Sequence, residues 1–317
     1  MRAIQMSEYG GPEVLELVEL PVPQPGDGEV LVRVSRAGLN FADTHRRTNT
    51  YIAKDELPLV PGLEVAGVRE DTGERVVALC GSGGYAEYAT APAALTFPIP
   101  DGVEDATALA LVLQGLTAWH LYRTSAHVGA GETVVVHAAA GGVGSLAVQL
   151  GKRLGAGRVI ATASTPDKRA LALELGADAA VDGAAEGLQD RLVEANLGRP
   201  VDVVFEMAGG AVFDESLAAL APFGRLVVYG IASHESNTIR SGELMRRSRA
   251  VVGFWFMHCL GRPAMIDEAL AELLSLVAAD ELRVVTGPAY ALEQAGQAQE
   301  DLAARRTTGK VTLDLTL

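Results

Sequence analysis

The chain has 317 residues, of which 49% are hydrophobic, 21% charged and only 5% aromatic, so its length suits about two globular domains with aliphatic cores. Its formal net charge of −14 argues against a nucleic-acid-binding protein and against docking on an anionic membrane, because both need a basic face. An acidic protein can still hold one phosphorylated ligand in a local basic pocket.

The first hundred residues predict a β-rich domain. Short runs of β-type composition are separated by turns rich in proline and glycine. These runs cover residues 15–20, 29–36, 64–68, 75–79, 85–89 and 95–98. Many short strands with regular turns are typical of a small barrel or sandwich.

From about residue 104 the pattern changes to helices and then to strands that alternate with helices. Helices are expected at 104–113, 116–122, 143–154, 167–175 and 186–196, and strands at 133–138, 158–163, 178–181, 201–207, 224–230 and 249–254. Unbroken apolar runs such as TVVVHA are typical of strands buried on both faces. We therefore predict an α/β fold with a doubly wound, parallel, six-stranded Rossmann sheet.

The last fifty residues predict two helices, 265–279 and 292–304, and a terminal strand, 310–315. No helix follows this strand, which leaves it free to return to the sheet of the first domain.

Compartment signals are few. The two cysteines, Cys80 and Cys259, lie far apart in the sequence, which favours reduced thiols over a disulfide framework. The first residues lack the apolar segment of a signal peptide, and no apolar run approaches the roughly 18 residues of a membrane span. We expect a cytoplasmic protein without a membrane anchor.

The strongest chemical signal is the loop AAAGGVG, Ala138–Gly144, which follows a predicted strand and opens a predicted helix. Glycines let the backbone approach a pyrophosphate, and the helix N-terminus presents free N–H groups and a partial positive charge. The loop is a variant of the dinucleotide fingerprint. The strand–helix–strand context favours nucleotide binding over a plain tight turn. The predicted cofactor contacts are Ala140, Gly141, Gly142, Val143 and Gly144.

The end of the second strand of this sheet indicates which dinucleotide is bound. NAD-binding sheets place a carboxylate there for the ribose 2′-hydroxyl, whereas this chain has Ala163 and Ser164 and no acid before Asp167. A hydroxyl at Ser164 and a cation at Lys168 suit a 2′-phosphate, which predicts NADPH. The alternative is that Lys168 and Arg169 only decorate a helix surface.

Several stretches together resemble a known family. They are GLNFADTHRR (38–47), PLVPGLEVAG (58–67), LQGLTAWHLY (113–122), VHAAAGGVG (136–144) and RRTTGKVTL (305–313). Over essentially the whole chain, the sequence resembles the zinc-free quinone oxidoreductase, or zeta-crystallin-like, branch of the medium-chain dehydrogenase/reductase superfamily. The resemblance implies a GroES-like β-barrel domain from residues 1–115 and 262–317, with a Rossmann dinucleotide-binding domain, 116–261, inserted between them.

The resemblance also bears on metal binding. Zinc-dependent members of the superfamily place a cysteine and a His–Glu pair where this chain has Asn40, Leu63 and Glu64. Zinc needs about three protein ligands, and two of them are replaced here, so we predict no metal. The six histidines show no paired metal spacing, and His137 is predicted to be a core histidine with its hydrogen bonds satisfied.

The resemblance assigns the candidate catalytic residues. In the family, the counterparts of Asn40 and Tyr51 lie near the nicotinamide, where an amide or phenol can donate to a substrate carbonyl as negative charge develops. Tyr51 can also pass a proton through water, or it can be only an apolar wall. His45 stands where relatives often carry tyrosine, and we expect it to be exposed on the surface. The other candidate cofactor contacts are Thr117, Gly230, Phe254, Trp255, Phe256 and Lys310.

The resulting hypothesis is an NADPH-dependent reductase of quinones or α,β-unsaturated carbonyls that transfers hydride directly, without a metal. Two alternatives stay open: an enoyl-thioester reductase, for which the basic cluster Arg246–Arg249 would bind a pantetheine phosphate, and a non-catalytic NADPH-binding protein. The cluster can equally be a solvated face. We also predict a homodimer formed at the apolar edge strand 249–254, whose interface would be an alternative place for Trp255 and Phe256.

Overall fold

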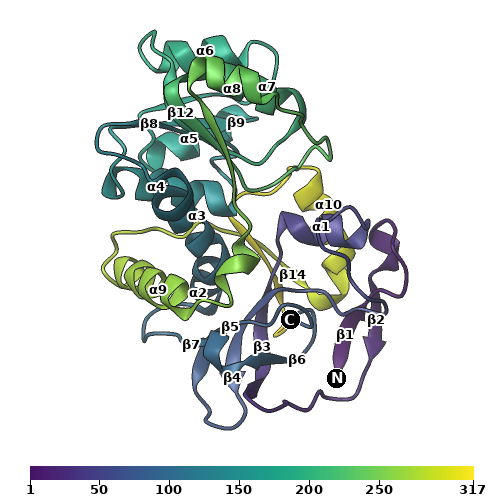
Figure 1. Ribbon diagram of the computed structural model, residues 1–317. Helices are drawn as coiled ribbons and strands as arrows, with labels where there is room; N and C mark the ends of the chain where they lie inside the picture. Colours follow the sequence, from purple (N-terminus) through teal and green to yellow (C-terminus); the bar gives the residue numbers. More distant parts are fainter. The chain divides into compact units, whose positions relative to one another are not determined.

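The structure, a computed structural model, describes all 317 residues (Figure 1). The chain forms two compact units. One, the discontinuous unit, comprises Met1–Gln114 and Cys259–Leu317, and the other, the inserted unit, comprises Gly115–His258. Each is described by itself below.

The discontinuous unit contains a seven-stranded sheet and a separate two-stranded ribbon. In the large sheet the strand order is β14-β15-β3-β4-β5-β7, and β6 also pairs with β3. The strands are β1 (Arg2–Gln5), β2 (Glu16–Glu19), β3 (Glu29–Gly38), β4 (Glu64–Arg69), β5 (Arg75–Leu79), β6 (Tyr88–Pro92), β7 (Thr96–Pro98), β14 (Thr286–Ala291) and β15 (Lys310–Asp314). Strand β15 runs antiparallel to β3, with Thr312 opposite Gly38, which confirms that the terminal strand returns to the sheet of the first domain.

Four α-helices belong to this unit: α1 (Phe41–Arg47), α2 (Asp105–Ala110), α9 (Pro263–Ala278) and α10 (Ala295–Ala303). Helix α1 begins where the Asp43 carboxylate accepts a hydrogen bond from the backbone N–H of Asn40 at 2.8 Å, a capping arrangement that satisfies an otherwise unpaired donor. Short 3₁₀ turns of this unit lie at Pro12–Val14, Ala93–Leu95 and Leu292–Gln294. A π-helical turn, Leu111–Gly115, and a 3₁₀ turn, Phe256–Cys259, lie at the two boundaries between the units.

The inserted unit is a parallel six-stranded sheet with the order β10-β9-β8-β11-β12-β13. Its strands are β8 (Thr133–Val136), β9 (Arg158–Ala163), β10 (Ala179–Asp182), β11 (Val201–Glu206), β12 (Leu220–Val228) and β13 (Ala250–Gly253). Its helices are α3 (Leu116–His120), α4 (Gly142–Arg153), α5 (Pro166–Glu174), α6 (Leu188–Ala195), α7 (Gly210–Ala219) and α8 (Ser241–Arg247), with a π-helical turn at Leu121–Ala126. This order is that of a Rossmann sheet, so the predicted fold class is confirmed.

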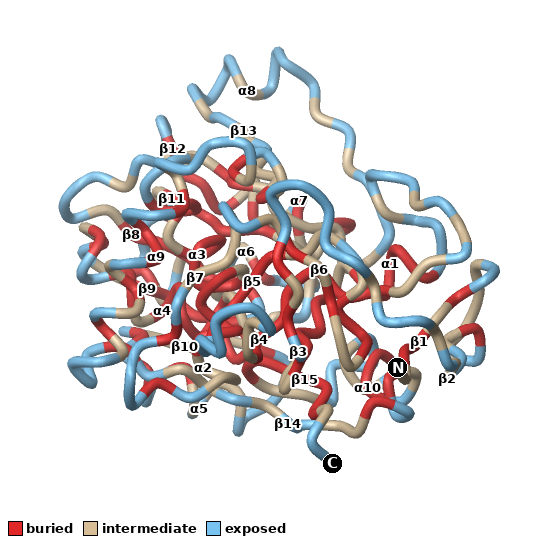
Figure 2. Tube along the Cα trace, turned by 90° about the horizontal axis from the view of Figure 1, so that it is seen from below, coloured by how far each residue is buried: buried red, intermediate tan, exposed pale blue.

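Burial follows the hydrophobic pattern of the sequence. Every residue of β8 is buried, whereas helix α8 has no buried residue and is drawn in the colours of exposed and partly exposed chain in Figure 2. Cys80 and Cys259 are both free thiols, as predicted. No helix combines the length and the apolar character that crossing a membrane requires.

Candidate functional site

The glycine-rich loop of the inserted unit connects β8 to α4. Ala138 takes a left-handed backbone conformation with φ of 49°, and Gly141 precedes the first helical residue, Gly142. The first hydrogen bond along the helix runs from the Ser145 N–H to the Gly141 carbonyl at 2.9 Å. The N–H groups of the three residues before Ser145 therefore have no acceptor within the helix, and they form an anion-binding N-terminus.

The loop is so tight that one position accepts only glycine. A Cβ atom on Gly144 would lie 2.3 Å from the carbonyl oxygen of Ala138 and 2.8 Å from the Cα of Ala139. The helix thus starts in direct contact with the backbone of the turn. These features fit a dinucleotide pyrophosphate.

His137, directly after β8, is a structural residue, as predicted. Its side chain is 2% exposed, and its two ring nitrogens lie 2.8 Å from the hydroxyls of Thr162 and Ser216. Burial lowers the pKa of His137 to about 4, so the ring is neutral at physiological pH. The histidine links the end of β8 to β9 and α7 beneath the loop.

The carboxyl ends of β9 and β10 form a polar corner, here called the β9–β10 corner and made of Ala163, Ser164, Lys168, Arg169 and Asp182. Ser164 is exposed and Lys168 is partly exposed. Arg169 donates from Nη1 to the carbonyl of Ala163 at 3.1 Å and to the carboxylate of Asp182 at 3.0 Å. Sequence reasoning did not single out Asp182, because it lies 19 residues beyond Ala163 and only the parallel register makes the two neighbours.

Aromatic side chains gather near the end of β13. The ring of Phe254 stacks with that of buried His120 at 6.0 Å, and the Trp255 ring lies edge-on to His258 at 5.0 Å. Phe256 is buried, and so is Thr117, which lies on α3 with His120. Gly230 follows β12, where an added Cβ would lie 3.1 Å from that of Met207.

The basic cluster of Arg246, Arg247 and Arg249 lies at the C-terminal end of α8, and one of its side chains is engaged by the chain itself. The guanidinium of Arg249 donates to the carbonyls of Leu217 and Ala218 at 2.7 and 3.1 Å, and also to that of Leu220. It thereby caps the end of α7. Arg246 and Arg247 remain exposed.

In the discontinuous unit, Asn40 lies in a buried polar cluster. Its Nδ2 donates to both carboxylate oxygens of Glu64, at 2.8 and 2.9 Å. Its Oδ1 accepts from Gln114 Nε2 at 3.2 Å and from Lys310 Nζ at 3.3 Å. Lys310 forms an ion pair with Glu64, and both side chains are 0% exposed. We call Asn40, Glu64, Gln114 and Lys310 the Asn40 cluster.

Two residues of the cluster and the neighbouring Leu63 occupy the positions that, by the resemblance, hold the metal ligands of zinc-dependent dehydrogenases. Asn40 supplies an amide, Leu63 a buried aliphatic chain, and Glu64 is engaged by an ammonium group of the chain itself. No group of three or more His, Cys, Asp and Glu side chains is arranged to hold a metal ion. The ammonium of Lys310, a predicted cofactor contact, bonds to Glu64, Asn40 and the carbonyl of Leu39.

Two residues of the segment after β3 differ in their surroundings. His45 was expected on the surface, but it is only 8% exposed, so that expectation is wrong. Its Nδ1 lies 3.2 Å from the Thr50 hydroxyl and its ring lies 5.5 Å from that of Phe41. Helix α1 packs within this unit so that every residue from Asp43 to Arg47 is buried, although the segment looks polar and exposed in the sequence. Tyr51 is partly exposed in the bend after α1.

Asp43 is a buried carboxyl that the sequence did not single out. Its Oδ2 accepts from the Asn40 N–H at 2.8 Å and from the Tyr85 hydroxyl at 2.9 Å, while its Oδ1 has no partner. Burial, reinforced by the nearby charge of Glu64, raises the pKa of Asp43 from 3.8 to about 6.

This raised pKa predicts a pH-dependent effect of Asp43→Asn. The folded chain holds the Asp43 proton more tightly than the unfolded chain, so the free energy of unfolding falls as the pH rises from about 4 to about 6. Asparagine cannot ionise. The variant should match the parent below about pH 3.5 and exceed it by about 3 kcal/mol above pH 6.5.

Urea denaturation at several pH values measures this difference. Asp71→Asn is the control, because this exposed carboxylate has its pKa lowered by Arg69 and should gain no stability at high pH. A difference between Asp43→Asn and parent that does not vary with pH would contradict the prediction.

Comparison with known proteins agrees with these features. Residues 26–101 match the alcohol dehydrogenase GroES-like domain and residues 142–277 match the zinc-binding dehydrogenase family. A quinone oxidoreductase of Pseudomonas aeruginosa is 35% identical over 98% of this chain and 99% of its own length.

Solved structures show the same similarity. The quinone oxidoreductase of Thermus thermophilus, described also in complex with NADPH, is 40% identical with a TM-score of 0.89, covering 99% of this chain and 100% of that one. The Escherichia coli quinone oxidoreductase complexed with NADPH is 31% identical with a TM-score of 0.92, at the same coverage.

Proposed function

Because the chain belongs to the quinone oxidoreductase branch of the medium-chain dehydrogenase/reductase superfamily, we propose that it is an NADPH-dependent oxidoreductase that reduces quinones or α,β-unsaturated carbonyls without a metal. The observation that carries this proposal is the junction between the glycine-rich loop and α4, where a Cβ on Gly144 would clash with the loop backbone and three N–H groups have no helical acceptor. The Asn40 cluster, with an amide and an aliphatic side chain at two of the metal-ligand positions, supports the metal-free part.

The inserted unit holds the cofactor. Bound NADPH supplies the hydride. The N–H groups of Gly142, Val143 and Gly144 bind its pyrophosphate, and Ser164 and Lys168 bind the 2′-phosphate. Thr117, Gly230 and the run Phe254–Phe256 are the further contacts that we assign to the cofactor, which they orient and shield from water.

Asn40 is the residue that we assign to substrate activation. Two carboxylate oxygens at 2.8 and 2.9 Å from one nitrogen lie too close together to receive the two diverging N–H bonds separately, so one N–H serves both. The second N–H can donate to a substrate oxygen as negative charge develops. Glu64 and Lys310 fix the orientation of the amide, and Tyr51 donates a proton, directly or through water.

Asn40→Ala should therefore lower kcat by about 10²-fold and leave the Kd for NADPH unchanged. NADPH oxidation is followed with quinones, enones, enoyl thioesters and simple aldehydes. Asn49→Gly is the control, because it removes an exposed amide at a position with φ of 55°, which glycine tolerates.

The same assay separates the alternative functions. Activity confined to enoyl thioesters would assign the chain to synthetic chemistry, and turnover of no acceptor would leave a non-catalytic NADPH-binding protein. Prolonged chelation should leave the rate unchanged. Full activity of Asn40→Ala on every acceptor would refute the role given to this residue.

We also propose a homodimer in the cytoplasm, paired through β13. This strand lies at the edge of the parallel sheet with its outer side unpaired, and its sequence is AVVG. An apolar edge strand tends to pair with another strand, and twofold dimers are the commonest oligomers.

Light scattering at micromolar concentration should give the mass of two chains. Proline removes one N–H from a strand, and N–H groups alternate in direction along it, so Val251→Pro and Val252→Pro affect opposite sides of β13. One variant should become monomeric while keeping the melting temperature of its inserted unit. A monomeric parent would disprove the pairing.

A further inference from the structure

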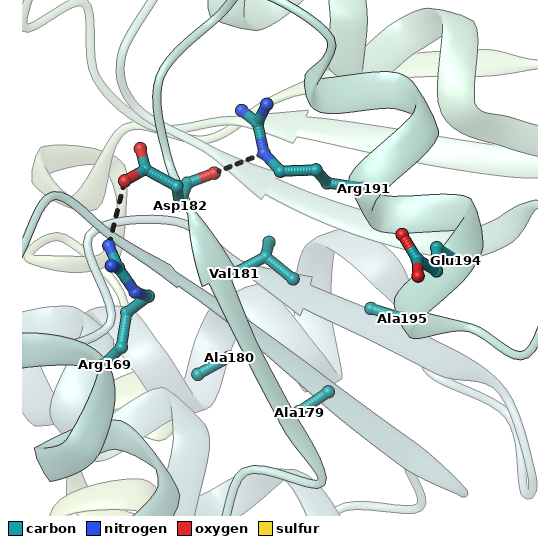
Figure 3. Close-up of a pocket in the computed structure, with 8 residues that line it drawn as sticks. All are labelled: Arg169, Ala179, Ala180, Val181, Asp182, Arg191, Glu194 and Ala195. Carbon is teal, nitrogen blue, oxygen red and sulfur yellow. Dashed lines mark hydrogen bonds and ion pairs between the residues drawn. The ribbon is translucent and has the colours of Figure 1, made fainter. Parts of the chain in front are cut away.

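The inserted unit contains a cavity of about 410 Å³ along the edge strand β10 (Figure 3). Arg169 of α5 and Arg191 of α6 flank Asp182 at the carboxyl end of the strand, and Glu194 and Ala195 line another part of the cavity. The two arginines approach the same aspartate but bond to it differently.

Arg191 holds the loop after β10 in place through hydrogen bonds to its backbone. Its Nε donates to the carbonyl of Asp182 at 3.1 Å and its Nη1 to that of Glu186 at 2.6 Å, while Nη2 donates to the carbonyl of Ala184. All three nitrogens of its guanidinium are committed to backbone oxygens. Arg191 therefore shapes the loop and has little capacity for a ligand.

Arg169 is clamped but keeps donors available. Both of its bonds, to the carbonyl of Ala163 and to the carboxylate of Asp182, use Nη1. Its Nε and Nη2 remain, on a side chain that is 24% exposed. The Ala184 N–H, at 2.9 Å, fixes the other oxygen of Asp182, and these contacts hold the pKa of Asp182 below its usual range.

The clamp ties the guanidinium to the last residues of two adjacent strands, Ala163 of β9 and Asp182 of β10. In Rossmann sheets the adenosine ribose binds at the end of the second strand, which here is β9, and an arginine nearby accommodates a 2′-phosphate. Resting on the proposed function, we propose that Arg169, held in place by Asp182, is a specificity-determining residue that binds the 2′-phosphate of NADPH together with Lys168.

The arrangement suits that role for two reasons. A guanidinium offers a planar pair of donors that matches phosphate geometry, which an ammonium group does not. Its position is also fixed before binding, so little side-chain entropy is lost when the phosphate arrives. Asp182 is the positioning residue. Its negative charge also repels the phosphate and so moderates the affinity.

The test uses isothermal titration with two probes that lack nicotinamide, 2′,5′-ADP and 5′-AMP, and with NADPH. Arg169→Gln should weaken 2′,5′-ADP binding by about tenfold or more and change 5′-AMP binding less than about twofold, because only the first probe carries the 2′-phosphate. Arg169→Lys should lie between parent and Arg169→Gln. Lys168→Gln measures how much Lys168 contributes to binding of the 2′-phosphate.

Asp182→Asn tests the positioning residue and should change the affinity for 2′,5′-ADP in the opposite direction from Arg169→Gln. The single oxygen of asparagine can keep the hydrogen bond from Arg169 while the bond from the Ala184 N–H is lost. Asparagine carries no charge, so 2′,5′-ADP should bind about threefold more tightly, as expected for removing a like charge about 6 Å away in water. Arg199→Gln is the matched control. It removes an exposed guanidinium just before β11, at the opposite end of the parallel strands, and should change neither probe.

Equal weakening of both probes by Arg169→Gln would show that Arg169 only supports the fold, and an effect no larger than that of Arg199→Gln would show that it does not contact the phosphate. Either result overturns the inference while leaving the proposed function intact. If the parent binds neither NADPH nor 2′,5′-ADP, the proposed function fails, and the inference fails with it.

Discussion

Replacing Lys310 by methionine should destabilise the discontinuous unit by about 3–5 kcal/mol, because it leaves the Glu64 carboxylate charged, buried and without a counter-ion. The Asn40 amide would remain as a hydrogen-bond donor to this carboxylate, and an amide cannot neutralise a charge. Urea denaturation of the variant measures the loss as a lower midpoint with an unchanged slope.

Two further variants make this measurement specific. Lys152→Met removes the same side chain from an ion pair with Asp178 whose members are 46% and 29% exposed, and it should cost less than about 1 kcal/mol. The double variant Lys310→Met, Glu64→Gln removes both charges and should recover much of the loss. If Lys310→Met behaved like Lys152→Met, the buried pair would not be an ion pair.

Gly144→Ala should both destabilise the inserted unit and abolish NADPH binding. The new Cβ would meet the backbone of the turn at 2.3 and 2.8 Å, and backbone atoms cannot rotate away as a flexible side chain can. We expect a loss of more than about 3 kcal/mol in the unfolding free energy, since the clash forces α4 away from the turn. The displaced N–H groups would no longer converge on one phosphate.

Gly242→Ala is the control for this change. Gly242 also lies in the first turn of a helix, α8, but a Cβ there meets nothing within 4 Å. Alanine should be neutral or stabilising by up to about 1 kcal/mol. Thermal melting and NADPH titration of both variants check the prediction, and tight NADPH binding by Gly144→Ala would contradict the assignment of the loop.

The strands of the parallel sheet were the part of the fold that could be read from the sequence. Strand β8 is wholly buried and therefore appears as an unbroken apolar run, which few other structures produce. Helix α7 was not predicted, because Gly209 caps it and Gly210 begins it, and two consecutive glycines in a sequence indicate a turn. The structure gives these glycines φ values of 76° and 59°. Helix α1 was not predicted either, because its arginines are polar in sequence but buried against Asp55 and Gln299.

The candidate site likewise has one part that the sequence predicts and another that it does not. The glycine loop is local, so its strand–turn–helix context already predicts its position and its role. The Glu64–Lys310 pair joins residues 246 positions apart, and the Arg169–Asp182 clamp depends on the register between two strands. No local pattern reveals such partners, because they are brought together only when the sheets form.

The separation of Glu64 from Lys310 also sets an order of events on the ribosome. Glu64 is synthesised 246 residues before its counter-ion, which at about 5–20 residues per second means a wait of roughly 12–50 s. Throughout that time the amino-terminal segment of the discontinuous unit lacks both β15 and the ammonium group that its buried carboxylate needs. The inserted unit, Gly115–His258, is one continuous segment that is completed earlier. The nascent chain can therefore assemble its parallel sheet while the amino-terminal strands, although older, still wait for the last fifty residues.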